Sequence, residues 1–212
     1  FFRAQLALVQ WSESQEQLAA LRDTEFTPQA WKLAIQFLIN HDQAEKAKSY
    51  IDRVRKKFPD SIELLFLEAN FLKQQGRDTR ADYLFSDFVA LKPNDPVRRL
   101  AMARWLIINN NSPKALLVLE GVRRYPDLTK RAENTLKLLT VQAHFHAGSY
   151  DEAEAGADEL MLASDTHAVG CMMKGLILAA KGQAAEADQW LAKAELANGN
   201  QIGPNPIQVN AR

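Results

Sequence analysis

The sequence has a single cysteine, Cys171, among its 212 residues. One cysteine cannot form an intrachain disulfide, and it excludes a metal site built from several thiolates. Long apolar runs are also missing, since none approaches the roughly 18–20 residues that a membrane-spanning helix needs. There is no excess charge of either sign, because 26 Lys and Arg balance 26 Asp and Glu. The composition therefore indicates no general attraction to nucleic acid or to an anionic membrane.

Motifs of catalysis and nucleotide binding are absent as well. The chain contains no G-x-G-x-x-G, G-x-x-x-x-G-K-[S/T], H-E-x-x-H or G-x-S-x-G pattern. Of the four histidines, His144 and His146 stand two apart on a predicted helix and point about 200° from each other. They cannot share a metal ion as an i, i+4 pair could. No base or orienting group can be paired with Cys171, which we expect to pack. We therefore expect no metal site, no cofactor and no enzyme activity.

The sequence does not decide the cellular compartment of the protein. The chain opens Phe-Phe-Arg without a methionine, so we expect it to be a trimmed or processed product. No signal peptide is visible, but an export signal or an anchor further upstream stays an open alternative. A lone cysteine does not decide the redox environment. The expectation is a soluble domain, either cytoplasmic or periplasmic.

What the sequence does contain is a repeat. Alanines recur at spacings of 34, 34, 38 and 34 residues, at Ala47, Ala81, Ala115, Ala153 and Ala187. The unit is clearest in residues 62–93, where apolar residues at helical spacing lie on both sides of Gly76 and a proline ends the pattern. Self-similarity at this period is the sequence signature of a helical solenoid.

The fourth unit departs from the others. From Pro126 to Ala153 is 27 residues, whereas the corresponding distance in the two preceding units is 22. The extra residues most simply lengthen its first helix, expected at about 128–147, by more than one turn. At the ends of the chain, residues 1–27 are expected to form an irregular first helix pair. Residues 198–212 are rich in Gly, Asn and Pro, and we expect an extended or disordered tail there.

The unit resembles the tetratricopeptide repeat (TPR), a motif of 34 residues with small residues at positions 8, 20 and 27, a frequent Gly at 15 and Pro at 32. In the second unit, positions 8, 15, 20 and 32 are filled by Ala69, Gly76, Ala81 and Pro93. Large residues at position 8 of the first and fourth units make the repeats degenerate. Five such repeats over residues 28–197 imply an all-α fold. It would be a right-handed superhelical solenoid of antiparallel helix pairs, with about twelve helices in a single domain over 1–197.

The resemblance also implies a binding surface. Members of the family bind partners with positions 2, 5, 9, 12 and 13 of each first helix, which line a concave groove. Carried over to this sequence, the partner-binding residues are Lys32, Gln36, Asn40, Phe66, Asn70, Lys73, Arg104, Ile108, Gln142 and Phe145. Other such positions hold Thr135, Leu138 and Val169. Such a groove suits an amphipathic helix or an extended peptide. The alternative is tighter curvature that buries the apolar positions against one another or against a neighbouring chain.

The leading hypothesis is a non-catalytic protein-interaction scaffold that binds a partner peptide or helix in this groove. Self-association through the fourth and fifth repeats is a subsidiary hypothesis. Two alternatives stay open: a repeat module of a bacterial cell-envelope assembly for secretion or polysaccharide export, and an accessory domain of a larger enzyme. Basic pairs such as Lys130-Arg131 lack the interleaved aromatic residues of single-strand binders. Nucleic acid is therefore not an expected partner.

Overall fold

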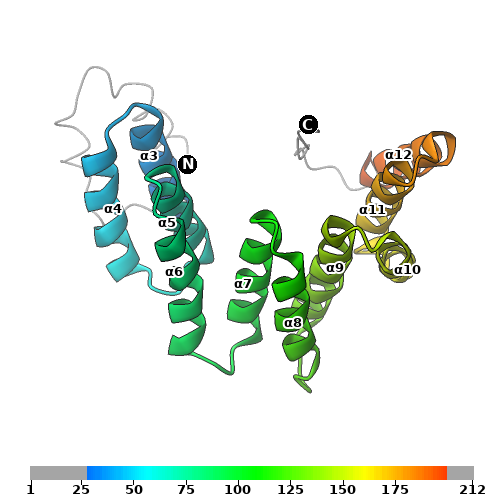
Figure 1. The fold of residues 1–212 in the computed structure, drawn as a ribbon, viewed down its shortest axis with the longest axis horizontal. Helices are drawn as coiled ribbons and strands as arrows, with labels where there is room; N and C mark the ends of the chain where they lie inside the picture. Colours follow the sequence, from blue (N-terminus) through cyan, green and yellow to red (C-terminus); the bar gives the residue numbers. More distant parts are fainter. Residues whose placement is uncertain (1–27, 200–212) are drawn as a thin grey trace. The chain divides into compact units, whose positions relative to one another are not determined.

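The structure is a computed structural model that describes residues 28–199. Ten α-helices and no strand occur within this range (Figure 1). The predicted all-α fold of helix pairs is thus confirmed. The count of about twelve helices included the expected pair in residues 1–27, which lies outside the described residues. The chain forms two compact units, divided after Pro93, and each is described by itself.

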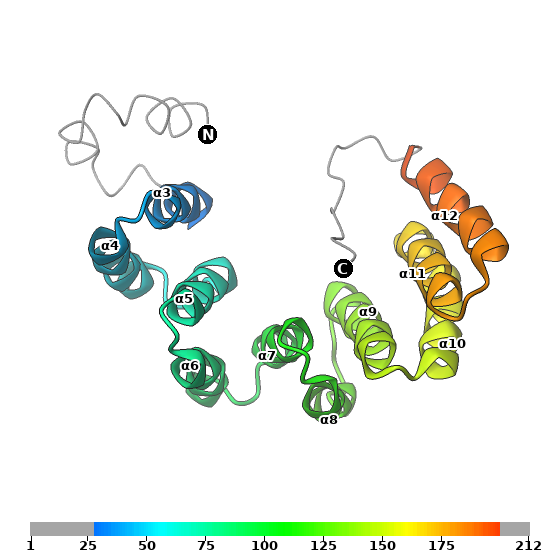
Figure 2. The ribbon, with the colours of Figure 1, turned by 45° about the horizontal axis from the view of Figure 1, so that its top comes forward.

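The first unit contributes four described helices and the second contributes six. Those of the first unit are α3 (Pro28–Asn40), α4 (Ala44–Lys57), α5 (Ile62–Gln74) and α6 (Asp78–Leu91). Those of the second are α7 (Pro96–Ile108), α8 (Ser112–Arg123), α9 (Lys130–Ala147), α10 (Tyr150–Met161), α11 (His167–Ala180) and α12 (Ala184–Gly199). Within the second unit, α7, α9 and α11 are the first helices of successive repeats and pack side by side, with α8 and α10 behind them (Figure 2). Because α12 ends at Gly199, it includes the first two residues of the predicted tail, and the rest lies outside the described residues.

The turn inside each repeat has the same backbone geometry. Its central residue has a positive φ, between 56° and 81°, at Asp42, Gly76, Asn110, Gly148 and Gly182. The next residue donates its N–H back to the preceding helix, for example from Arg77 to the carbonyl of Leu72 at 2.9 Å. This is the Schellman type of helix end, which satisfies carbonyls that the helix leaves open. The left-handed position favours Gly, and after it Asn or Asp, which explains the residues found there.

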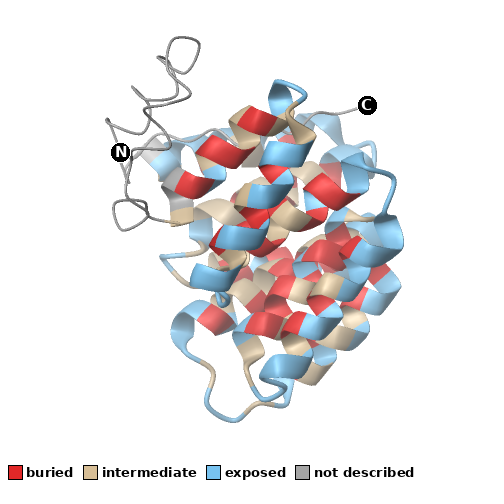
Figure 3. Cartoon of the chain, turned by 90° about the vertical axis from the view of Figure 1, so that its left-hand side faces the viewer, coloured by how far each residue is buried: buried red, intermediate tan, exposed pale blue. Residues whose placement is uncertain are grey.

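Each repeat closes around one alanine. The five alanines that define the period are between 0% and 2% exposed. A methyl side chain lets the two helices of a pair approach closely, and larger neighbours such as Leu38, Phe85 and Leu119 fill the space around it. Buried residues accordingly follow the sides of the helices that face other helices (Figure 3).

The first helix of the fourth repeat is longer than its counterparts. Helix α9 has 18 residues, whereas α5 and α7 have 13 each. It begins after Thr129, whose side-chain oxygen accepts the N–H of Ala132 at 3.2 Å, and ends at Gly148 in the left-handed conformation. The predicted lengthening is confirmed, and it extends the N-terminal end of the helix beyond the regular repeat.

Candidate partner-binding site

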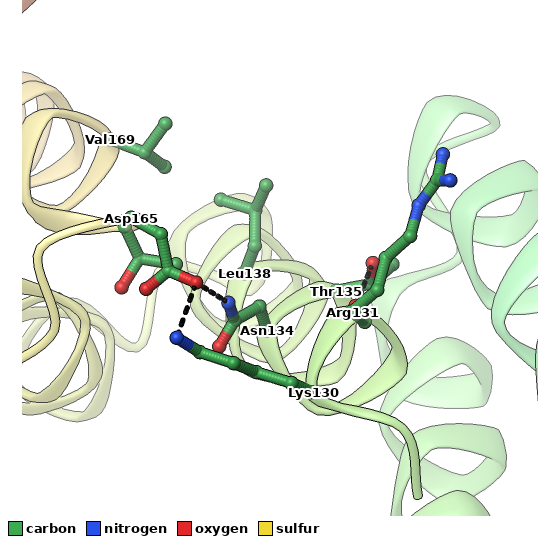
Figure 4. A pocket seen from close by; sticks show the side chains of 8 residues that line it. Lys130, Arg131, Asn134, Thr135, Leu138, Asp165 and Val169 are labelled. Carbon is green, nitrogen blue, oxygen red and sulfur yellow. Dashed lines mark hydrogen bonds and ion pairs between the residues drawn. The ribbon is translucent and has the colours of Figure 1, made fainter.

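A pocket of about 510 Å³ lies between the N-terminal half of α9 and the start of α11, inside the second unit (Figure 4). Its lining is Lys130, Arg131, Asn134, Thr135, Leu138, Asp165, Thr166 and Val169. Leu138 and Val169 supply an apolar floor, and the polar residues come from the first turns of α9 and from the turn before α11. The volume is within the range of sites that take small ligands or side chains of a partner.

One side of the pocket is held together by an ion pair. Lys130 Nζ lies 3.1 Å from Asp165 Oδ2, and Asn134 donates to the same oxygen from Nδ2 at 2.8 Å. The hydrogen bond from Lys130 and, less strongly, the one from Asn134 hold the pKa of the Asp165 carboxyl below its ordinary value. Asp165 therefore stays ionised, neutralises Lys130, and ties the turn before α11 to the extra turn of α9.

Arg131 is the second cation of the pocket, and Asp165 does not neutralise it. Its side chain extends from α9 away from Lys130 and Asp165 (Figure 4), and it has no ion-pair partner among residues 28–199. The adjacent Thr135 donates its hydroxyl to the carbonyl of Arg131 at 2.8 Å, so that hydroxyl is used within the helix. An exposed guanidinium at the edge of a pocket can bind a carboxylate through two parallel N–H donors.

The predicted partner-binding residues of the first unit lie on two helices. Lys32 and Asn40 are exposed on α3, and Gln36 donates to Asn40 at 3.2 Å. On α5, Asn70 and Lys73 are exposed, and Lys73 lies 3.9 Å from the Asp78 carboxylate. Phe66, the remaining residue of α5, is half-buried, and its ring packs edge-on against that of buried Phe85 with centroids 4.9 Å apart. Phe66 thus also contributes to the core.

Those of the second unit lie on α7 and α9, and none of them lines the pocket. Arg104 and Ile108 are exposed on α7, with Ile108 at 57%. Gln142 and Phe145 are half-buried on α9, and the Phe145 ring packs near Tyr150 with centroids 5.9 Å apart. These residues stay predictions as partner contacts.

None of the eight pocket residues is among the ten predicted partner-binding residues, and five of the eight also lie outside the motif positions of the TPR binding face. Lys130, Arg131 and Asn134 belong to the extra turn of α9, and Asp165 and Thr166 to the turn before α11. The sequence feature that could have pointed to the first three is the five additional residues of the fourth repeat, which include a basic pair. By contrast Thr135, Leu138 and Val169 stand at positions that the TPR resemblance assigns to the binding face, and the pocket includes all three.

The structure also pairs Cys171 with a histidine, a contact that the sequence did not predict. His167 Nε2 lies 3.6 Å from Cys171 Sγ, at i, i+4 on α11. The thiol is fully buried, and burial raises its pKa. A nucleophilic cysteine needs a lowered pKa and access to substrate, so this pair lacks the character of a catalytic dyad.

In residues 28–199, no helix combines the length and the apolarity needed to cross a bilayer. The same residues hold no group of three or more His, Cys, Asp or Glu side chains placed around a metal ion.

The sequence matches no known family model, and a comparison with curated proteins also finds no match. Similar folds are found among solved structures. A tetratricopeptide repeat protein from Parabacteroides merdae is 16% identical with a TM-score of 0.62, over 92% of this chain and 75% of that protein. BtubC from P. vanneervenii is 13% identical with a TM-score of 0.56, over 99% and 97%.

A third similar structure is MamA from Desulfovibrio magneticus RS-1. It is 16% identical with a TM-score of 0.52, over 82% of this chain and 97% of that one. At such identities the likeness concerns the fold alone. Together with the repeated turns and buried alanines, it shows that the chain is a helical-repeat protein with degenerate, TPR-like repeats.

Proposed function

We propose that this protein is a non-catalytic interaction scaffold, and that the pocket between α9 and α11 binds a peptide segment carrying a carboxylate beside an apolar side chain. The observation that supports this most is the pocket itself, which joins an uncompensated Arg131 to the apolar pair Leu138 and Val169. Three of its residues occupy positions with which TPR proteins bind partners.

The chemistry of the pocket favours a carboxylate. Arg131 can donate two parallel hydrogen bonds to one carboxylate, although solvent screens part of this attraction because the side chain is exposed. Lys130 adds little to that attraction because Asp165 already neutralises it at 3.1 Å. An apolar side chain of the partner would cover Leu138 and Val169, which are both half-buried and so still expose apolar area.

The test is a selection from an unbiased peptide display library on the whole chain, followed by affinity measurement by fluorescence anisotropy. We expect the selected peptides to share an Asp or Glu within a few residues of a large apolar residue. Arg131→Glu should weaken their binding at least tenfold, and Leu138→Asp should do the same by removing the apolar contact.

Lys114→Glu is the matched control, since it reverses one exposed charge on α8, outside the pocket. It should change the affinity less than twofold. Selected peptides without an acidic preference, or binding that survives Arg131→Glu, would place the partner site elsewhere. In that case Lys32, Arg104 and the other predicted residues become the next positions to reverse.

The remaining hypotheses keep their own tests. Self-association through the fourth and fifth repeats predicts a sedimentation coefficient that rises with concentration, and a constant monomer value would reject it. The two alternatives, a module of a cell-envelope assembly and an accessory domain of a larger enzyme, concern the larger assembly or protein to which the chain would belong. Both are compatible with the same pocket.

A further inference from the structure

Three side chains with soft or borderline donor atoms meet where α10 ends and α11 begins. Cys171 Sγ lies 3.5 Å from Met161 Sδ and 3.6 Å from His167 Nε2. The thiol is fully buried, Met161 is half-buried and His167 is exposed. The cluster therefore extends from the core to the surface, and the histidine forms its outer side.

The two distances match the edges of a small coordination polyhedron. With metal–sulfur bonds of about 2.3 Å and a metal–nitrogen bond of about 2.0 Å, they correspond to ligand–metal–ligand angles of about 100° and 114°. Both angles are near the tetrahedral angle. An ion bound to Cys171 Sγ could thus also reach Met161 Sδ or His167 Nε2.

The histidine is already oriented as a ligand. Its Nδ1 lies 2.8 Å from the carbonyl oxygen of Met161. A carbonyl only accepts, so Nδ1 carries the hydrogen, and in the neutral ring Nε2 presents its lone pair to Cys171. Metal-binding histidines commonly have such an outer hydrogen bond, which fixes the tautomer and the ring orientation.

From this geometry we infer that Met161, His167 and Cys171 form a binding site for one soft metal ion, Cu(I). Thiolate and thioether donors favour Cu(I) over the harder divalent ions, and one imidazole completes a low-coordinate set. Binding exchanges the thiol proton for the metal: the S–H bond breaks, a Cu–S bond forms, and one proton is released to solvent. No electron is transferred in this step.

The inference does not depend on the proposed peptide pocket, because no residue of the cluster lines it.

The experiment is anaerobic titration of the whole chain with Cu(I) against a chromophoric Cu(I) chelator, with Zn(II) titrated in parallel. We expect one Cu(I) per chain and X-ray absorption with two sulfur neighbours and one nitrogen neighbour. Zn(II) should bind at least a hundredfold more weakly. Met161→Leu, which keeps the side-chain volume, and His167→Gln should each weaken Cu(I) binding at least tenfold.

His146→Gln is the matched control, because it removes an exposed histidine of α9 outside the cluster. Its Cu(I) affinity should equal that of the unchanged chain, and far-ultraviolet circular dichroism should show every variant folded. Failure to take up one equivalent, an affinity unchanged by Met161→Leu or His167→Gln, or tighter binding of Zn(II) would each overturn the inference.

Discussion

Gly170 lies buried in the contact between α10 and α11, and replacing it with alanine tests how closely these helices pack. A Cβ at this position would stand 2.6 Å from Met161 Cγ and 2.9 Å from both the Ala157 carbonyl oxygen and the Met161 backbone nitrogen. Real Cβ atoms essentially never approach other atoms so closely. Two of the three neighbours are backbone atoms, which cannot rotate away. The two helices would therefore have to separate.

The expected change in the free energy of unfolding is the balance of two terms. Replacing glycine by alanine inside a helix gains up to about 1 kcal/mol. Overpacking typically costs about 1–3 kcal/mol, and backbone neighbours favour the upper end of that range. Gly170→Ala should then lower the free energy of unfolding by about 1–2 kcal/mol. For a chain of this length, about 2–4 °C of melting temperature corresponds to each kcal/mol, so Tm should fall by about 2–8 °C.

Gly121→Ala in α8 is the matched control. Its added Cβ would meet nothing nearer than Arg99 Nη1, at 3.9 Å. The helix gain is then unopposed, and Tm should rise by up to about 4 °C. Differential scanning calorimetry of both variants measures the contrast. A Gly170→Ala chain as stable as the Gly121→Ala chain would refute the close approach of α10 and α11.

Three further predictions concern stability. Leu160→Ala removes a fully buried side chain and should lower the free energy of unfolding by about 2–5 kcal/mol. Leu117→Ala, at a position that is 75% exposed, should change it by no more than about 0.5 kcal/mol. Urea unfolding measures both variants. Thr129→Ala removes the N-terminal cap of α9 and should lower the free energy of unfolding by about 0.5–2 kcal/mol in the same assay. An unchanged free energy of unfolding would show that the hydrogen bond to Ala132 does not stabilise the fold. Because the pKa of Asp165 is lowered in the folded state, its stabilising contribution should be complete above the ordinary carboxyl pKa and be lost as the pH falls through the lowered value. Melting curves from pH 7 downward should therefore fall less steeply for Asp165→Asn, and parallel curves would contradict this.

The sequence was sufficient for the fold because the repeat constrains backbone geometry at fixed places. The turn residue of each repeat adopts the left-handed conformation, and Asp42 and Asn110 replace glycine there without breaking the period. The five buried alanines follow the same spacing. Only a few residue types fit a close helix contact or a left-handed turn position. Their spacing can therefore be recognised in the sequence without knowing which residues surround them in the fold.

The binding site was less accessible from the sequence for a physical reason. Position within a repeat tells which face of a helix a residue occupies, but not how deeply its side chain packs. Phe66 was predicted on the binding face, yet its ring contacts buried Phe85. Similarly, Asp165 lies in a turn outside the motif positions and meets Lys130 from 35 residues away along the chain. No periodicity predicts a contact between a turn and an irregular extra turn of helix.

The extra turn of α9 is what makes the fourth repeat chemically distinct. A helix of 13 residues, like α5 and α7, that ended at Ala147 would begin at residue 135. Lys130 and Arg131 would then precede the helix and would not be held against the turn before α11. The longer helix brings both cations into the lining of the pocket that Leu138 and Val169 also line, and Asp165 then neutralises one of them. It follows that the ion pair positions the pocket while Arg131 is left to bind a ligand. Reversal of Asp165 should therefore disturb the pocket's shape as well as its charge, and reversal of Arg131 should disturb charge alone.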